Sequence, residues 1–135
     1  METLTKEVIC IFVEKSINDK QYNDELLFVL PSKTIQRVKK VLHLDLNSYQ
    51  GVISSHSVRH VSKGHPNDLD YICEILEVIQ NFSKVQKSIT KDPKTGAILV
   101  NLEFYKKYDG EIVKLVKVKV HRKKRLELKT IFIKY

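Results

Sequence analysis

The feature that most constrains this chain is a change in its hydrophobic period after Asn81. Before that point, apolar residues recur mainly at helical spacing. Beyond it they alternate with polar residues, which is typical of half-buried strands. Strands are predicted at about 82–89, 98–105, 116–121 and 126–133. Turn residues separate them at 92–96, 108–110 and 122–125. We therefore expect the α+β class, with helices packed on a four-strand antiparallel β-meander.

The segment before this sheet is expected to add a pair of strands and three helices. Residues 7–13 form a short, β-branched apolar run, and residues 25–30 form a second one, so both are predicted as strands of a loose hairpin. A helix is predicted from Ser32, with a connecting loop at 47–51 behind it. Two further helices are expected at about 54–63 and from 67 onward, separated by Gly, His and Pro.

The size of the chain indicates one domain with an uneven charge. It has 135 residues, of which 42% are hydrophobic, which is enough for a single core. The net charge is +8. Residues 1–81 contain 9 Lys/Arg and 11 Asp/Glu, whereas residues 82–135 contain 15 Lys/Arg and 5 Asp/Glu. The positive excess therefore lies in the C-terminal part and predicts an anionic partner there. We divide the domain into an N-terminal part, 1–43, and a core, 44–135.

Several classes of protein are disfavoured by what the sequence lacks. It has no apolar run long enough to cross a bilayer, and residues 1–10 show no signal-peptide pattern. Cys10 and Cys73 both lie among apolar residues, so we expect buried, reduced thiols and a cytoplasmic protein. The chain has no Gly-rich phosphate loop and no paired Cys-x-x-Cys, and no cofactor or metal is expected.

The segment most suited to chemistry is the histidine-rich stretch at 54–66. On a helix, His56, Arg59, His60 and Lys63 have the i, i+3, i+4, i+7 spacing of a shared face. His65 follows at the end of that helix. Two imidazoles beside two cations suit RNA cleavage without a metal. Histidine can transfer protons near neutral pH, and cations can neutralise a phosphorane.

Less specific interpretations of these residues stay open. A short polar helix face can simply be solvated, and a histidine pair at i and i+4 can bind zinc. Arg59 and Lys63 disfavour a dication at that face, and the segment contains no acidic residue. His43 lies between two leucines and is expected to be structural. Thr130 shares its alternation face with Leu128, which is also consistent with a threonine that faces the core.

Phosphate-binding candidates lie on the predicted sheet. They are the polar-face residues of the third meander strand, the basic turn behind it and the terminal tyrosine: Lys117, Lys119, His121, Arg122, Lys123 and Tyr135. The cations would hold flanking phosphates, with the salt dependence that such contacts imply. Tyr135 could stack on a base. Each of these residues could equally be an ordinary solvated surface residue.

Motifs across about 44–135 resemble the nuclease domains of the barnase–EndoU–colicin–RelE (BECR) superfamily, in particular its phage-borne and polyvalent-protein branch. They are Leu44-x-Leu46 with Tyr49 and Ile53, then Arg59-His60-Val61-x-Lys63-x-His65, then Asp68-x-Asp70-Tyr71-Ile72-x-x-Ile75-Leu76, and finally Leu126-x-Leu128-x-Thr130-Ile131-x-x-Lys134. The resemblance implies helices on a four-strand antiparallel sheet and metal-independent endoribonuclease activity. The family's helix histidine falls on His60, with Lys63 and His65 beside it, and its final-strand hydroxyl falls on Thr130.

The sequence thus leads to one functional hypothesis and two alternatives. The leading hypothesis is a toxin-like or phage-associated endoribonuclease with His60 as its main acid or base. His56 or His65 would be the second proton-transfer group, and no carboxylate is identified as a general base. RNA would be the substrate, and an immunity or antitoxin protein would be a further partner. The alternatives are a nucleic-acid-binding module without catalysis and a phage structural or interaction domain.

Overall fold

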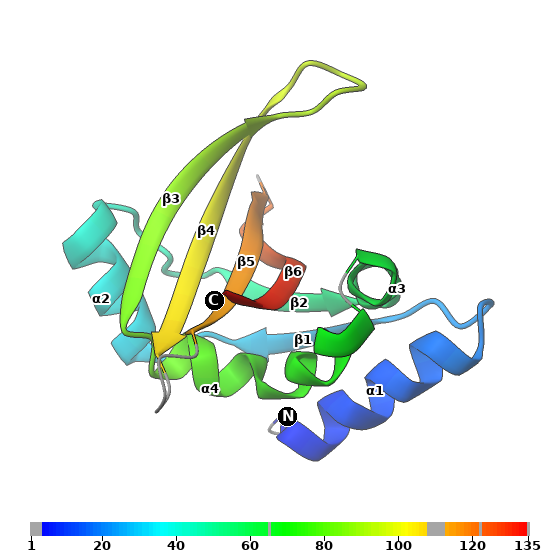
Figure 1. Cartoon of the computed structure of the whole chain (residues 1–135). Helices are drawn as coiled ribbons and strands as arrows, with labels where there is room; N and C mark the ends of the chain where they lie inside the picture. The colour runs from blue at the N-terminus through cyan, green and yellow to red at the C-terminus, as the bar shows by residue number, and fades with distance from the viewer. Residues whose placement is uncertain (1–3, 65, 108–112, 122, 135) are drawn as a thin grey trace.

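The computed structural model describes residues 4–64, 66–107, 113–121 and 123–134 and confirms the α+β class (Figure 1). In chain order, the elements are α1 (Lys6–Asn18), β1 (Glu25–Val29), α2 (Ser32–Leu42), β2 (Gln50–Ser54), α3 (Ser55–Gly64), the 3₁₀ helix η1 (Pro66–Glu74), α4 (Ile75–Gln80), β3 (Lys84–Lys91), β4 (Ile98–Lys107), β5 (Val113–His121) and β6 (Arg125–Lys134). Within these residues no helix is both long and apolar enough to cross a bilayer. The turn predicted at 108–110 lies outside them.

All the described strands belong to one six-stranded sheet, in the order β1-β2-β6-β5-β4-β3. The strands β3 to β6 pair with their sequence neighbours and are antiparallel. β2 lies parallel to β6 through Gln50–Val52 and Arg125–Glu127, and β1 is antiparallel to β2 at the edge. The N-terminal strands are therefore not a separate pair, because they extend the same sheet. Figure 1 shows β3 and β4 rising from it as a long, curved hairpin.

The prediction of a strand at residues 7–13 is wrong, because this segment is part of helix α1. Ile9, Phe12, Val13 and Ser16 are its buried residues, and their spacing is helical, so one side of the helix faces the core. Thr5 is the N-cap of the helix, and its side-chain oxygen accepts a hydrogen bond from the Val8 amide at 3.3 Å. A β-branched run has a moderate strand preference, and the burial of this stripe overrides it.

The partner of β1 is β2, which begins at Gln50 inside the loop predicted at 47–51. Phe28 on β1 lies opposite Gly51 on β2, and a Cβ atom at Gly51 would overlap the Phe28 ring. The aromatic ring thus occupies the space that a side chain at position 51 would need. A strand glycine of this kind marks close packing, whereas the sequence pattern had indicated a loop.

The helix predictions near the middle of the chain agree with the structure. Helix α2 begins at Ser32 as expected, although Pro31 is its N-cap and makes no side-chain capping bond. Helix α3 begins behind Ser54, whose hydroxyl accepts the Ser57 amide at 3.0 Å. The third predicted helix is divided into the 3₁₀ helix η1 and the short α4. Together with α1, these helices pack their apolar sides into one core with β3, β4, β5 and β6.

The expectation of two free thiols is wrong, because Cys10 of α1 and Cys73 of η1 form a disulfide. Their Cα atoms are 5.2 Å apart, within the range that a disulfide spans. The two helices pack against each other, which brings together two cysteines separated by 63 positions in the sequence. The pairing depends on the tertiary position of α1, which the sequence pattern did not identify as a helix.

Removal of this disulfide is expected to lower the free energy of unfolding by about 4 kcal/mol, because the bond closes a long loop in the unfolded chain. The measurement is urea denaturation of the wild type, with and without a thiol reductant, and of the double variant Cys10→Ser/Cys73→Ser. Reductant should destabilise the wild type and leave the double variant unchanged. Equal midpoints for the oxidised wild type and the double variant would contradict the expectation.

Substitution Gly51→Ala is expected to cost about 1–3 kcal/mol of stability, because the new methyl group overpacks the space filled by the Phe28 ring. The measurement is the urea midpoint in the wild type and in a Phe28→Leu background, where the smaller side chain should relieve most of the loss. Gly64→Ala is the matched control, since nothing lies within 4 Å of a Cβ atom there. A Gly51→Ala protein as stable as the wild type would show that the contact is not tight.

Candidate active site in a groove beside α3

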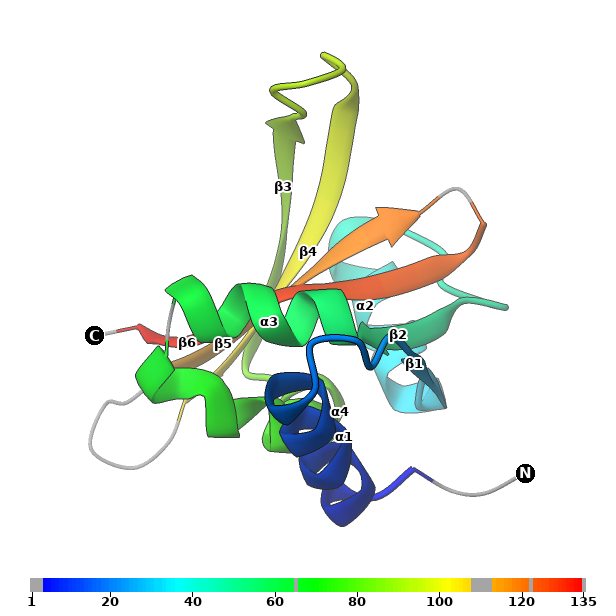
Figure 2. The ribbon, with the colours of Figure 1, turned by 90° about the vertical axis from the view of Figure 1, so that its right-hand side faces the viewer.

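Helix α3 follows directly on β2 and packs against both β6 and α1 (Figure 2). Ser54, the last residue of β2, caps the helix, so the strand passes into the helix without a connecting loop. Val58 and Val61 are fully buried in the core. This burial determines how the helix is rotated about its axis and therefore which of its residues face solvent.

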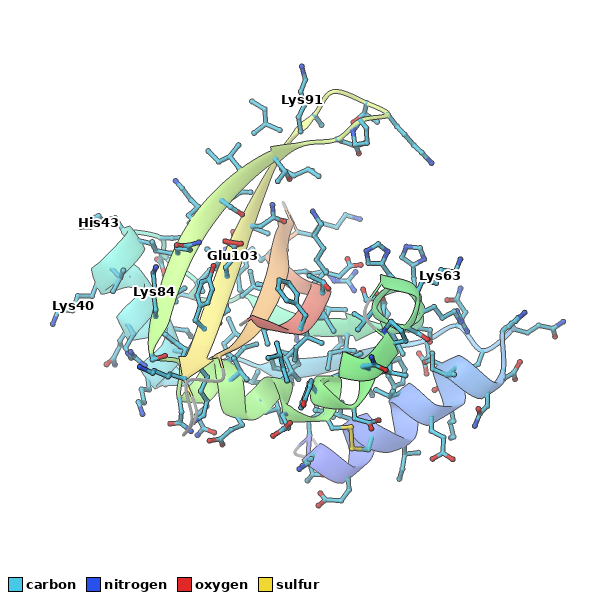
Figure 3. The ribbon with its side chains drawn as sticks, in the orientation of Figure 1. Lys40, His43, Lys63, Lys84, Lys91 and Glu103 are labelled. Atoms are coloured by element: carbon cyan, nitrogen blue, oxygen red, sulfur yellow. A yellow bond between two sulfur atoms is a disulfide. The ribbon has the colours of Figure 1, made fainter. Side chains whose placement is uncertain are left out.

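The histidines of α3 lie on its exposed side, as the helical spacing predicted. His56, His60 and Lys63 are all exposed, and they follow one another at i, i+4 and i+7. Figure 3 shows Lys63 at α3, on the opposite side of the molecule from Lys40 and His43 of the α2 end. His43 is exposed and has the left-handed conformation of a helix C-cap, with φ of 56°. The two histidines of α3 are thus well separated from it.

A groove of about 230 Å³ lies between α3 and the sheet. Its lining comes from α3, β4 and β6: His56, Ser57, His60, Leu99, Glu127, Leu128 and Lys129. Glu127 and Lys129 are half-buried, whereas both histidines are exposed. The groove therefore brings two imidazoles together with one carboxylate and one ammonium group from a strand far away in the sequence.

Glu127 and Lys129 are the two functional candidates of the groove that the sequence did not indicate. The first of them, Glu127, belongs to a clear alternating pattern. It alternates with the buried Leu126 and Leu128, so its side chain lies on the opposite face of β6 from the core. That alternation is visible in the sequence, and it could have placed Glu127 on the polar face. Its place in the same groove as the histidines could not be inferred, because it depends on the packing of α3 against β6.

A bulge in β6 determines where Lys129 and Thr130 lie. Thr130 is opposite Lys117 in the register, but the next pair joins Leu128 to Val118, so the backbone register of β6 passes over Lys129. Leu128 and Ile131 are both buried, with two residues between them instead of one. The simple alternation had indicated that Thr130 shares a face with Leu128. Because of the bulge, the two side chains lie on opposite faces of β6. Lys129 lines the groove, and Thr130 is not among the lining residues.

Arg59 was predicted on the catalytic face, but its guanidinium group is bound elsewhere. Its Nε donates to the Ser16 carbonyl at 2.9 Å, and its Nη2 donates to the carbonyls of Asp19 at 3.0 Å and of Tyr22. These carbonyls lie at and just beyond the C-terminal end of α1, where a cation is favoured. Arg59 is not among the lining residues of the groove. We therefore reassign it from phosphorane stabilisation to the attachment of α3 to α1.

Several predicted residues cannot be placed in the groove. His65, Arg122 and Tyr135 lie outside the described residues, as do the side chains of Lys117, Lys119 and His121. The backbone register sets Lys119 between Asn101 and Glu127 on neighbouring strands. Lys123 is exposed in the turn before β6.

The polar face of the sheet continues from the groove towards β3. Gln86 donates from its Nε2 to Glu103 Oε2 and to the Tyr105 hydroxyl, both at 2.9 Å. Burial raises the pKa of the Tyr105 hydroxyl above its ordinary value, and the Glu103 carboxylate raises this pKa further. Asn101 donates to the Thr90 hydroxyl at 3.1 Å. These hydrogen bonds connect β3 and β4 across the polar face of the sheet.

The described part of the chain contains no group of three or more His, Cys, Asp or Glu side chains placed to hold a metal ion. The two histidines and Glu127 share the groove without forming such a cluster.

Substitution Arg59→Lys is expected to lower the free energy of unfolding by about 2 kcal/mol, because an ammonium group cannot reproduce the forked contacts to the α1 carbonyls. The measurement is urea denaturation followed by circular dichroism. Lys63→Ala is the control from the same helix and should change stability by less than about 0.5 kcal/mol, since Lys63 is exposed. Equal stabilities of the two variants would contradict the anchoring role of Arg59.

No protein-family model, curated protein or solved structure matches this chain. The resemblance to BECR nucleases stays a prediction from the motifs between residues 44 and 135.

Proposed function

We propose that this protein is a metal-independent endoribonuclease and that the groove beside α3 is its active site. The observation that carries the proposal is the convergence of His56, His60, Glu127 and Lys129 on one groove. Two imidazoles and a carboxylate provide groups that accept and donate protons, and the ammonium group provides positive charge. The resemblance of the motifs between residues 44 and 135 to BECR nucleases, which implies metal-independent RNA cleavage and the same role for His60, adds to this support.

The proposed reaction uses the 2′-hydroxyl of RNA as its nucleophile. Glu127 accepts the 2′-hydroxyl proton while the 2′-oxygen forms a bond to phosphorus. The bond from phosphorus to the 5′-oxygen then breaks, and protonated His60 donates a proton to that leaving oxygen. The products are a 2′,3′-cyclic phosphate and a free 5′-hydroxyl, so atoms and charges balance without a metal or a water molecule in this step.

His56 and Lys129 have supporting roles in this proposal. Lys129 stabilises the negative charge that develops on the phosphorane oxygens. His56 lies one helical turn before His60 on the same exposed side, where it can bind a phosphate oxygen. The positive excess at 82–135 supplies an attractive field for the RNA backbone around the groove. DNA lacks the nucleophilic 2′-hydroxyl and would not be cut.

The proposed place of action is the cytoplasm, where cellular RNA is abundant. A nuclease of this kind would endanger the cell that makes it, so an immunity or antitoxin protein is the partner that we propose beside RNA. Disulfides persist in oxidising compartments and are rare in a reducing cytoplasm, so in the cytoplasm we expect the Cys10–Cys73 bond to be open. It joins α1 to η1 and does not line the groove, so the proposed chemistry does not depend on it.

RNA cleavage is expected in the presence of EDTA, and His60→Ala is expected to reduce it by roughly 10²–10⁴-fold, the usual contribution of general acid–base catalysis. Glu127→Gln should cause a loss of the same order, because the amide cannot accept the proton. The measurement is the rate of cleavage of a labelled RNA of mixed sequence, with the product ends identified by mass spectrometry. A 2′,3′-cyclic phosphate should appear.

The matched control is His43→Asn, which removes an exposed histidine on the far side of the molecule (Figure 3). Asparagine tolerates the left-handed backbone that His43 adopts, so this variant should fold and cleave like the wild type. If the folded wild type leaves RNA intact in EDTA, or if His60→Ala cleaves as fast as His43→Asn, the proposal is wrong. RNA binding without cleavage would favour the non-catalytic module.

A further inference from the structure

Helix α2 and strand β3 carry positive charges and no negative ones. Together, they contain Lys33, Arg37, Lys39, Lys40, Lys84, Lys87 and Lys91, with no Asp or Glu in either element. The two elements pack against each other, although about 40 residues separate them in the sequence. The negative net charge of residues 1–81 conceals the contribution of α2, because acidic residues elsewhere in that part outweigh it.

Two of these cations hold the helix in place. The Arg37 guanidinium lies 3.9 Å from the centroid of the Phe82 ring and donates to the Phe82 carbonyl at 2.7 Å. Lys33 donates to Asn81 at 3.3 Å. The other five are exposed and form what we call the basic edge: Lys39, Lys40, Lys84, Lys87 and Lys91. Arg37 and Lys33 thus attach α2 next to β3, and this attachment assembles the basic edge.

The basic edge is elongated, and its Lys84 end is distant in the strand from the groove. Its Lys91 end follows Thr90, which pairs with the groove-lining Leu99. β3 is the outermost strand of the sheet, and its path from Lys84 to Lys91 covers about 23 Å at the rise of an extended chain. Figure 3 shows Lys40 and Lys84 on one side of the molecule, Lys91 at the top near the end of β3, and Lys63 on the other side. β3 is three strands from β6, which corresponds to about 14 Å across the sheet.

Exposed apolar side chains lie among these lysines. Ile89 is 63% exposed and lies between Lys87 and Lys91 on the same face of β3, and Ile98 is 74% exposed and opposite Lys91 on β4. A projecting two-stranded ribbon with lysines and isolated apolar side chains suits contact with nucleic acid, where cations meet phosphates and apolar groups meet sugars or bases. Lysines can also protect an edge strand from pairing with another chain.

We propose that the basic edge is a second RNA-binding surface, which holds the phosphate backbone of the RNA whose cleavage we assign to the groove. This inference rests on the proposed function for its substrate. It implies that the preferred substrate is an RNA chain long enough to reach from the groove across the sheet to β3. Five cations spread along one edge match a polyanion with regularly repeated charge.

The experiment measures binding of a fluorescein-labelled 30-nucleotide RNA by anisotropy between 50 and 200 mM KCl. It uses the His60→Ala background, in which cleavage is expected to be too slow to interfere with a binding measurement. The edge variant Lys40→Gln/Lys87→Gln/Lys91→Gln is expected to reduce the slope of log affinity against log salt by about 2, because each lost phosphate contact contributes about 0.7 on a single strand. The matched control is Lys6→Gln/Lys15→Gln/Lys20→Gln, which removes the same charge from exposed positions of α1 and the turn behind it and should retain the slope.

The outcomes separate this inference from the proposed function. If the salt slope falls in the edge variant alone and the wild type does not cleave RNA, RNA binding by the basic edge is supported and the nuclease proposal is wrong. If the edge and control variants have equal salt slopes, the proposal that the basic edge binds RNA is wrong, even when the wild type cleaves RNA. Self-association of the edge variant with an unchanged slope would overturn the proposal in favour of edge protection. Loss of binding to phosphatidylserine vesicles with an unchanged RNA slope would overturn it in favour of a membrane surface.

Discussion

The packing of α3 between α1 and β6 is the constraint on which the candidate site depends. Val58 and Val61 bury one side of α3 in the core, and the Arg59 guanidinium attaches the helix to three carbonyls at the end of α1. These contacts determine the rotation of the helix, and His56 and His60 consequently face the groove above β6. A buried apolar contact and a set of charged hydrogen bonds thus orient two histidines that make no contribution to the core.

The N-terminal helix α1 has a larger role than its sequence indicates. It contributes to the core, forms a disulfide with η1 through Cys10, and accepts the contacts of Arg59. The buried hydroxyl of Ser16 also donates to Ser55 at the start of α3, at 3.0 Å. Residues 1–43 therefore support the part of the chain that contains α3 and its histidines. Helix α2 from the same segment brings cations to the outer strand β3.

The parts of the fold that were predicted correctly are those with a local signal. The strands β3 to β6 have alternating apolar residues and turn residues between them, and α2 and α3 have clear helical spacing. The turn at 92–96 is one such case, where the Asp92 side chain accepts the Lys94 amide at 2.9 Å and Gly96 adopts φ of 73°. The segments predicted wrongly, α1 and β2, are those whose local pattern is ambiguous. A seven-residue apolar run fits a strand or a helix, and β2 is short and begins within polar residues.

The sequence alone determined the α+β class, the uneven charge and the spacing that sets His56, His60 and Lys63 on one side of a helix, because each follows from local composition or periodicity. Only the tertiary structure decided that Glu127 and Lys129 share a groove with these histidines, that Arg59 binds α1 and that Cys10 meets Cys73. Each of these is a contact between segments distant in the sequence. Such contacts depend on how the apolar faces of several elements pack into one core, and no single segment contains that information.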